Sequence, residues 1–319
     1  MPCSIGIDIG STATKVAVLD EGGALVHTLL CPTGFSSVDA AARAREELAR
    51  AGFDVATCPV VATGYGRVAV DFADKVVTEI TCHGAGAARL FGPEGTVVDV
   101  GGQDTKVIAL HKGKVRKFAM NDKCSAGTGR FLEIMADRLG VSQDELSRLA
   151  AAGQPTVISN MCTVFAESEV ISLVGKGEPR ENIANGVINS VVKRITTLVQ
   201  QVGGEEYFLT GGLCENGYIV EQLGRSLGAP VASCPEARYA GAIGAAIFAA
   251  ELDGKSAAAG DPRAEVDLQA TGAGAGNSQP ASDPRAEGDP QAAAQPRAST
   301  PAAAAQAQPA SALQAATML

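Results

Sequence analysis

The chain is 319 residues long, with 46% hydrophobic and 19% charged residues. This length predicts two domains plus extensions, and the composition predicts a globular body. The net charge is −9 and no basic run is present, which argues against binding of nucleic acid and against a polybasic membrane patch. Because no signal-peptide pattern opens the chain and no apolar run is long enough to cross a bilayer, we expect a cytoplasmic protein.

Strands and helices alternate along the body of the chain. The strands predicted in its first part are Ser4–Gly10, Thr14–Leu19, Leu25–Leu30, Val60–Thr63 and Val76–Thr78, and its helices are Val38–Ala51 and His83–Phe91. The strands predicted in its second part are Thr96–Gly101, Thr105–Leu110, Val115–Met120 and Tyr207–Thr210. Its helices are Gly129–Leu139, Gln143–Ala151, one that begins near Cys162, Asn182–Val202 and Tyr239–Leu252. The alternation predicts an α/β body of two lobes, residues 1–95 and 96–252, with the last helix able to pack back on the first lobe.

Residues 253–319 differ in composition from the body. They are mostly Ala, Pro, Gly, Gln and Ser, and almost no large apolar side chain occurs among them. Such a segment buries too little apolar surface to offset the entropy lost on ordering. We therefore predict a disordered tail.

Eight cysteines are spread along the chain without clustering. With no signal-peptide pattern, the expected state is a set of reduced, mostly buried thiols. The positions are Cys3, Cys31, Cys58, Cys82, Cys124, Cys162, Cys214 and Cys234.

A strand–turn–strand pattern occurs twice. Asp8–Leu19 and Asp99–Leu110 share six of twelve positions, and in each copy an Asp ends the first strand just before a Gly. Glycine lets backbone N–H groups approach an anion, and the Asp can hold Mg²⁺ through water. One copy alone could be an ordinary hairpin, but two copies in register favour a pair of phosphate-binding turns that clamp a triphosphate between the lobes. The pattern is not a Walker P-loop.

These hairpins resemble the two phosphate motifs of the actin/hexokinase/Hsp70 superfamily, and Phe208–Leu213 resembles its adenosine motif. The resemblance implies two ribonuclease-H-like lobes with ATP in the cleft, and Gln103 or Asp104 as the residue that orients the attacking water. The nucleotide-binding residues that it implies are Asp8, Gly10, Ser11, Thr12, Lys15, Asp99, Gly101, Gly102, Gln103, Thr210, Gly211 and Gly212, with Asp8 and Asp99 also facing Mg²⁺.

Two cysteines precede predicted helices. Cys124 lies before the helix that begins at Gly129, and Cys162 lies where another helix begins, so free N–H groups favour the thiolate at both. Two thiolates are too few for a [4Fe–4S] cluster, which takes four, whereas a two-fold dimer supplies four. On this chemistry alone, two buried structural thiols remain the simpler interpretation.

The wider pattern resembles the activator component of (R)-2-hydroxyacyl-CoA dehydratases, among the BadF/BadG/BcrA/BcrD-type ATPases. The matching segments are Gly6–Thr12, Ala62–Arg67, Cys82–His83, Asp99–Asp104, Asn121–Phe131 and Cys162–Ser172. The resemblance implies a homodimeric ATPase of anaerobic metabolism with one [4Fe–4S] cluster between the subunits, ligated by Cys124 and Cys162 of each. It also implies that ATP and Mg²⁺ drive one electron from ferredoxin or flavodoxin to a separate dehydratase.

Three alternatives share the hairpins. One is the nucleotide-binding subunit of a benzoyl-CoA reductase-type complex, which also has the cluster. Another is a small-molecule kinase of the same fold, which needs no iron, and the third is an actin-like polymer protein. Of the remaining candidates, Cys82 and His83 are assigned to packing, and His27 and His111 lie in predicted strands without ligand geometry.

Overall fold

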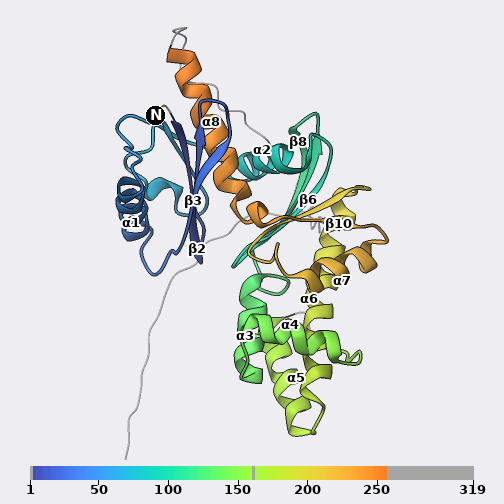
Figure 1. The fold of residues 1–319 in the computed structure, drawn as a ribbon. Helices are drawn as coiled ribbons and strands as arrows, with labels where there is room; N and C mark the ends of the chain where they lie inside the picture. Colours follow the sequence, from blue (N-terminus) through green and yellow to red (C-terminus); the bar gives the residue numbers. More distant parts are fainter. Residues whose placement is uncertain (1–2, 160–161, 257–319) are drawn as a thin grey trace, which may run out of the picture. The chain divides into compact units, whose positions relative to one another are not determined.

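The structure, a computed structural model, describes residues 3–159 and 162–256 (Figure 1). Its strands form two five-stranded mixed sheets, each flanked by helices, which confirms the predicted α/β class. The predicted tail lies almost wholly outside the described residues. None of the helices in the described part of the chain has the length and apolar character needed to cross a membrane.

The first sheet has the order β3-β2-β1-β4-β5. Its strands are β1 (Cys3–Ile9), β2 (Ala13–Asp20), β3 (Leu25–Pro32), β4 (Val60–Thr63) and β5 (Lys75–Val76). β1 is buried along its whole length and pairs antiparallel with β2 but parallel with β4. The last residues of β1 and β4 therefore point to the same edge of the sheet.

The second sheet repeats this arrangement, with the order β10-β9-β6-β7-β8. Its strands are β6 (Gly95–Val100), β7 (Thr105–His111), β8 (Lys114–Asn121), β9 (Tyr207–Gly211) and β10 (Val231–Ala232). β6 pairs antiparallel with β7 and parallel with β9, as β1 does with β2 and β4. The short β10 was not predicted.

Some helices pack directly on the sheets, whereas those within residues 129–175 mainly contact other helices. The helices are α1 (Ser37–Arg50), α2 (Glu79–Phe91), α3 (Gly129–Leu139), α4 (Gln143–Ala152), α5 (Thr163–Gly175), α6 (Arg180–Val202), α7 (Gly217–Leu227) and α8 (Ala240–Ser256), with two 3₁₀ turns, η1 (Arg67–Ala69) and η2 (Pro235–Tyr239). Side-chain caps at Ser36, Ser142 and Asn216 begin α1, α4 and α7 by accepting hydrogen bonds from backbone N–H groups. α7 was not predicted, and α2 begins at Glu79 rather than at His83.

α8 returns from the end of the body to the first sheet. It packs against α2 and against β1, β2 and β4 (Figure 1). Glycines make these contacts close: a Cβ on Gly6 of β1 would lie 1.9 Å from the Ala242 carbonyl oxygen, and one on Gly244 would lie 1.8 Å from that of Cys82. No side chain fits there, so the strand and the two helices are held backbone against backbone.

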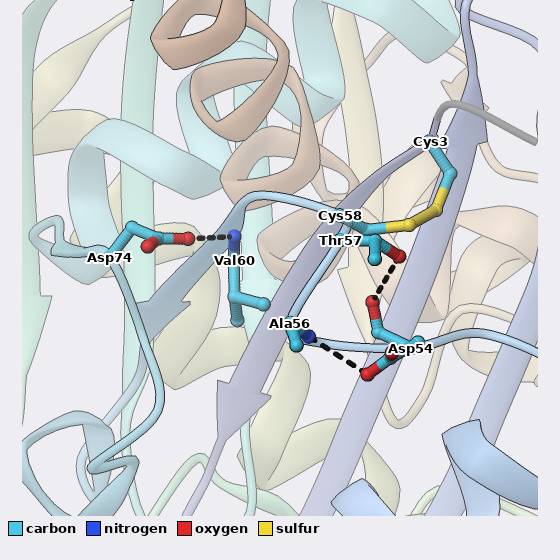
Figure 2. Close-up of a disulfide and its surroundings, with 7 residues drawn as sticks. All are labelled: Cys3, Asp54, Ala56, Thr57, Cys58, Val60 and Asp74. Atoms are coloured by element: carbon cyan, nitrogen blue, oxygen red, sulfur yellow. Dashed lines mark hydrogen bonds between the residues drawn. A yellow bond between two sulfur atoms is a disulfide. The ribbon is translucent and has the colours of Figure 1, made fainter.

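Cys3 and Cys58 form a disulfide, which corrects the expectation that every cysteine is a free thiol (Figure 2). Cys3 begins β1, and Cys58 lies two residues before β4, the strand beside it. The Asp54 turn presents Cys58, because its carboxylate accepts a hydrogen bond from the Ala56 N–H at 2.9 Å. The register of β1 and β4, which is not readable from the sequence, brings the two cysteines together.

Candidate nucleotide and cysteine sites

The two hairpins face one cavity of about 620 Å³, within the range of small-molecule sites. Their turns touch, since a Cβ on Gly102 would lie 2.1 Å from the Thr12 hydroxyl oxygen. Of the residues predicted for the nucleotide, the cavity lining includes Asp8, Gly10, Ser11, Thr12, Lys15, Asp99, Gly101, Gly102, Gln103, Gly211 and Gly212, together with Asp104. Thr210 is buried behind this lining and contacts Asp99.

The internal duplication is larger than the two hairpins. In the sheets, Asp8 pairs with Thr63 and Asp99 pairs with Thr210, and a glycine with positive φ follows each threonine, Gly64 at 87° and Gly211 at 85°. A Cβ on Gly64 would lie 2.4 Å from Oδ1 of Asp8, and one on Gly211 would lie 3.0 Å from Oδ1 of Asp99. Each half thus encloses its aspartate with a Thr-Gly pair from the neighbouring strand. Thr63 and Gly64 were not assigned to the site from the sequence.

The Asp99 carboxylate is well partnered. Its Oδ1 accepts a hydrogen bond from the Thr210 hydroxyl at 2.8 Å and lies 3.2 Å from Nδ1 of His83. Its Oδ2 lies 3.5 Å from Nζ of Lys106. Burial favours the protonated acid, but the nearby His83 and Lys106 outweigh it and hold the pKa of Asp99 well below its ordinary value.

Asp8 is equally buried but has fewer partners. Its Oδ2 lies 3.8 Å from Nζ of Lys15 and 3.9 Å from Nε2 of His83, both beyond hydrogen-bond distance. Its Oδ1 has no hydrogen-bond partner among the described residues. A buried carboxylate oxygen with no partner fits the predicted role of facing hydrated Mg²⁺, because it remains available to a cation or its water.

Lys106 is at the centre of a buried charge network. Its Nζ lies 2.8 Å from Oε1 of Glu79 and 2.8 Å from Oδ1 of Asp104. Burial disfavours the ammonium, but Asp99, Glu79 and Asp104 outweigh it and raise the pKa of Lys106. The Asp104 pKa is raised because burial exceeds the effect of Lys106. Asp104 is therefore anchored by this lysine, whereas Gln103, the other predicted water-orienting residue, is exposed at the turn.

Glu79 and His83 were not assigned to the site from the sequence, and His83, which was assigned to packing, is buried at the cavity lining. Because α2 begins at Glu79, the two residues lie one turn apart on the same face of the helix, and both line the cavity. Burial lowers the pKa of His83, but the carboxylates of Asp99 and Asp8 together outweigh burial and raise it. Cys82 does pack in the core, where burial raises the pKa of its thiol to about 12.

The two candidate cluster cysteines lie on adjacent turns. Cys162 is the N-cap residue of α5 and is exposed, whereas Cys124 is half-buried in the loop between β8 and α3. Ser125 and Thr163, the residues that follow them, form a hydrogen bond between their hydroxyl groups at 2.8 Å. Asn121 shapes the first turn by donating to the Cys124 carbonyl at 2.9 Å.

The cysteine loop is hydrogen-bonded to the second phosphate turn. The N–H groups of Gly129 and Arg130, which begin α3, donate to the carbonyls of Gly101 and Gly102 at 2.9 and 2.8 Å. The Thr105 hydroxyl donates to the Gly127 carbonyl at 2.7 Å. Three hydrogen bonds thus connect the hairpin that faces the cavity to the segment that carries Cys124.

The profile of the BadF/BadG/BcrA/BcrD ATPase family matches residues 5–249 of this chain. The chain belongs to this family. Its resemblance to the family, stated from the motifs, is therefore confirmed.

Several named proteins are similar to this chain over nearly their whole length. The (R)-2-hydroxyglutaryl-CoA dehydratase activating ATPase of Acidaminococcus fermentans is 41% identical over 252 residues, covering 77% of this chain and 96% of that protein. A benzoyl-CoA reductase subunit of Thauera aromatica is 32% identical over 264 residues, covering 78% and 94%. A solved structure of the activator of the 2-hydroxyisocaproyl-CoA dehydratase from Clostridium difficile with bound ADPNP is 35% identical, with a TM-score of 0.74, and covers 82% of this chain and all of that one. The predicted actin/hexokinase-like ATPase fold is confirmed by this match.

Proposed function

We propose that this ATPase is a dehydratase activator that delivers one low-potential electron to a 2-hydroxyacyl-CoA dehydratase at the expense of ATP. Ferredoxin or flavodoxin is the proposed electron donor and the cytoplasm the proposed location. The observation that carries the proposal is the direct hydrogen bonding between the Gly101–Gly102 turn and the first residues of α3. The names of the similar activators support the proposed partner.

The cavity supports ATP and Mg²⁺ as ligands. Two glycine turns with aspartates at their bases face it, and the relative from C. difficile was solved with ADPNP bound. We assign the phosphates to the turns at Gly10–Thr12 and Gly101–Gln103, and the nucleoside to Thr210–Gly212. Asp8 and Asp99 would hold Mg²⁺ through water.

The cysteine turns fit half of a [4Fe–4S] site. Cys124 and Cys162 offer two thiols from adjacent turns, and the N-terminus of α5 adds free N–H groups that can donate to a cluster sulfur. Two chains related by a two-fold axis would supply four ligands to one cluster. The cluster would supply a one-electron carrier there.

Exposed apolar residues beside Cys162 support the homodimer. Val164 and Phe165 lie in the first turn of α5 and are 66% and 63% exposed, and Ile171 and Val174 continue along the same helix. An exposed apolar helix next to an exposed thiol is typical of a protein–protein interface. Burying it against a second copy would bring the Cys162 turns of the two chains together.

The coupling follows from the contacts of α3. When the lobes close on a nucleotide, the Gly101–Gly102 turn moves with the phosphates, and the hydrogen bonds to Gly129 and Arg130 transmit this movement to the Cys124 loop. In a dimer with the cluster on its axis, such a movement changes the surroundings of the cluster. Identical cluster spectra with ADP and with an ATP analogue would contradict this coupling.

Iron content tests the proposed function. We expect anaerobically purified protein to be brown and to contain about four irons per dimer, lost in the Cys124→Ser and Cys162→Ser variants. Cys31→Ser is the matched control, because Cys31 is a free cysteine of β3 outside the site. A colourless wild type that phosphorylates a small molecule would instead identify a kinase.

Similarity to a benzoyl-CoA reductase subunit supports a second candidate function, a nucleotide-binding subunit of such a complex. Both functions need the cluster, so iron content does not separate them. Purification from the native source does: a stable complex with other reductase components supports the second candidate. A separable homodimer that activates an added dehydratase supports the first.

A further inference from the structure

His83 lies between the two hairpins. Its Nδ1 is 3.2 Å from Oδ1 of Asp99, and its Nε2 is 3.9 Å from Oδ2 of Asp8. The side chain is 3% exposed, and neither ring nitrogen has a well-aligned hydrogen bond to a described residue. Leaving a buried imidazole so poorly satisfied is costly, and such groups concentrate where function requires them.

The backbone encloses this histidine and Asp8 together. A Cβ on Gly241 of α8 would lie 2.7 Å from Nε2 of His83 and 2.7 Å from Oδ2 of Asp8. Gly241 therefore lets α8 cover both groups, so the ring has little freedom to turn away from the two carboxylates. Each of its nitrogens is held toward the aspartate of a different hairpin.

A metal ion is the alternative use of this position. Single ligand atoms of Asp8, Glu79 and His83 lie within 4.8 Å of one another, a spacing that a metal could bridge. However, the Glu79 oxygen nearest to His83 is Oε1, at 3.7 Å, and the same oxygen lies 2.8 Å from the Lys106 ammonium. A cation between Glu79 and His83 would stand beside this buried positive charge, which disfavours a metal ion at this position.

We propose that His83 is a positioning residue for ATP hydrolysis, which holds the Asp99 carboxylate through Nδ1 and presents Nε2 to Asp8 across the cleft. In hydrolysis, the water oxygen bonds to the γ-phosphorus as the bond to the β,γ-bridging oxygen breaks, ADP keeps that electron pair and a proton of the water is released. This transfer depends on the relative position of the two phosphate turns, because each holds part of the same triphosphate. Glu79 assists by holding Lys106, the second partner of Asp99.

Two amide substitutions test the roles of the two ring nitrogens separately. The amide nitrogen of Asn takes the approximate place of Nδ1, and that of Gln the place of Nε2. Because only Nδ1 lies near hydrogen-bond distance, we expect His83→Asn to keep kcat within about tenfold of wild type and His83→Gln to lose about ten- to a hundredfold. The KM for ATP should change less than about threefold in both, since the glycine turns are untouched.

The measurement is steady-state ATP hydrolysis by the full-length protein, purified anaerobically, with melting temperatures of all variants. His111→Gln is the matched control, because His111 is half-exposed at the end of β7 and is not among the residues that line the cavity. A greater loss in His83→Gln than in His83→Asn at similar melting temperature supports the proposal. Wild-type kcat in both variants, or equal losses that follow the melting temperature, would overturn it.

The inference rests on the ATP-hydrolysing part of the proposed function, and its failure is distinguishable from failure of the electron-transfer part. ATP turnover is read without a dehydratase or an electron donor. Iron content in the same preparations reports on Cys124 and Cys162. A protein without iron whose ATP turnover depends on Nδ1 of His83 would contradict the activator proposal but support the positioning role of His83.

Discussion

The two phosphate hairpins carry the same residue types in the same order, but their surroundings differ. Around Asp99, the Thr210 hydroxyl, His83 and Lys106 occupy both carboxylate oxygens. Around Asp8, no partner lies within 3.5 Å among the described residues, and Oδ1 is without a hydrogen bond. The second hairpin is thus fixed by side chains before any nucleotide binds, whereas the Asp8 carboxylate of the first hairpin remains available to a ligand.

The lysines of the hairpins follow the same division. Lys106 is 1% exposed and holds Glu79 and Asp104 at 2.8 Å, but Lys15 is 14% exposed and makes one long contact, with Asp8 at 3.8 Å. A repeated motif can therefore serve two purposes in one protein. The second copy is an anchor connected to the cysteine loop, and the first is the part free to adjust to the ligand.

The largest expected effect on stability comes from replacing Lys106, and Lys15 is its counterpart in the first hairpin. Lys106→Met leaves three neighbouring carboxylates, at Glu79, Asp99 and Asp104, without their ammonium. We expect a loss of about 3–5 kcal/mol in the free energy of unfolding, the usual cost of removing one partner from a buried ionic group. Lys15→Met should cost at most about 2 kcal/mol, because a single long ion pair contributes little.

Urea unfolding without nucleotide, followed by circular dichroism, measures both lysine variants. The matched substitution keeps side-chain volume similar, so the comparison isolates the charge. Equal losses in the two variants would contradict the division between an anchored and an adjustable hairpin.

Reduction of the disulfide in the first sheet is expected to have the next largest effect on stability. Cys3 and Cys58 are 55 residues apart, so their bond restricts the unfolded chain. Reduction should lower the free energy of unfolding by about 2–4 kcal/mol. Thermal unfolding with and without dithiothreitol measures it, and the Cys3→Ser/Cys58→Ser variant should not respond to the reductant. Eight rather than six titratable thiols in unfolded, unreduced, iron-free protein would show that the bond does not form.

Most of the fold was predictable because strand and helix periodicity is local. β4 and α3 have the predicted bounds, and the other strands and helices that were predicted lie within a few residues of the expected ranges. α7 was missed although its buried residues Ile219 and Leu223 lie one helical turn apart, because Gly217 and Gly224 within this short stretch weaken a helix prediction. β10 is two residues long and exists through its pairing with β9, a tertiary contact.

The site was predictable where spacing alone defines it. Asp and Gly at fixed offsets identify both turns, but no offset relates Cys3 to Cys58 or His83 to Asp8, because these pairs form through the arrangement of β1, β4 and α2. His83 was missed for a further reason: with the helix taken to begin there, its one-turn relation to Glu79 is lost. The Thr-Gly pairs at Thr63 and Thr210 could be recognised in the sequence, since each threonine lies at the end of an apolar strand.

The smallest expected effect concerns these two threonines. Thr210→Val removes the hydroxyl that donates to Oδ1 of Asp99 at 2.8 Å. A buried hydrogen bond to a charged acceptor contributes about 1.5–3 kcal/mol, so we expect a loss of that size in the free energy of unfolding. Thr63→Val should cost less than about 1 kcal/mol, because the Thr63 hydroxyl is buried without an oxygen or nitrogen partner among the described residues and lies against the Cys82 thiol.

Addition of ATP and Mg²⁺ turns the threonine pair into a test of the adjustable hairpin. If Asp8 moves toward the ligand on binding, the Thr63 hydroxyl remains dispensable and Thr63→Val keeps the stabilisation that wild type gains from nucleotide. If instead Asp8 turns to pair with Thr63, as Asp99 pairs with Thr210, the variant loses part of that gain. The nucleotide-dependent shift in melting temperature decides between these outcomes, and the second would mean that the two halves become equivalent only when the site is filled.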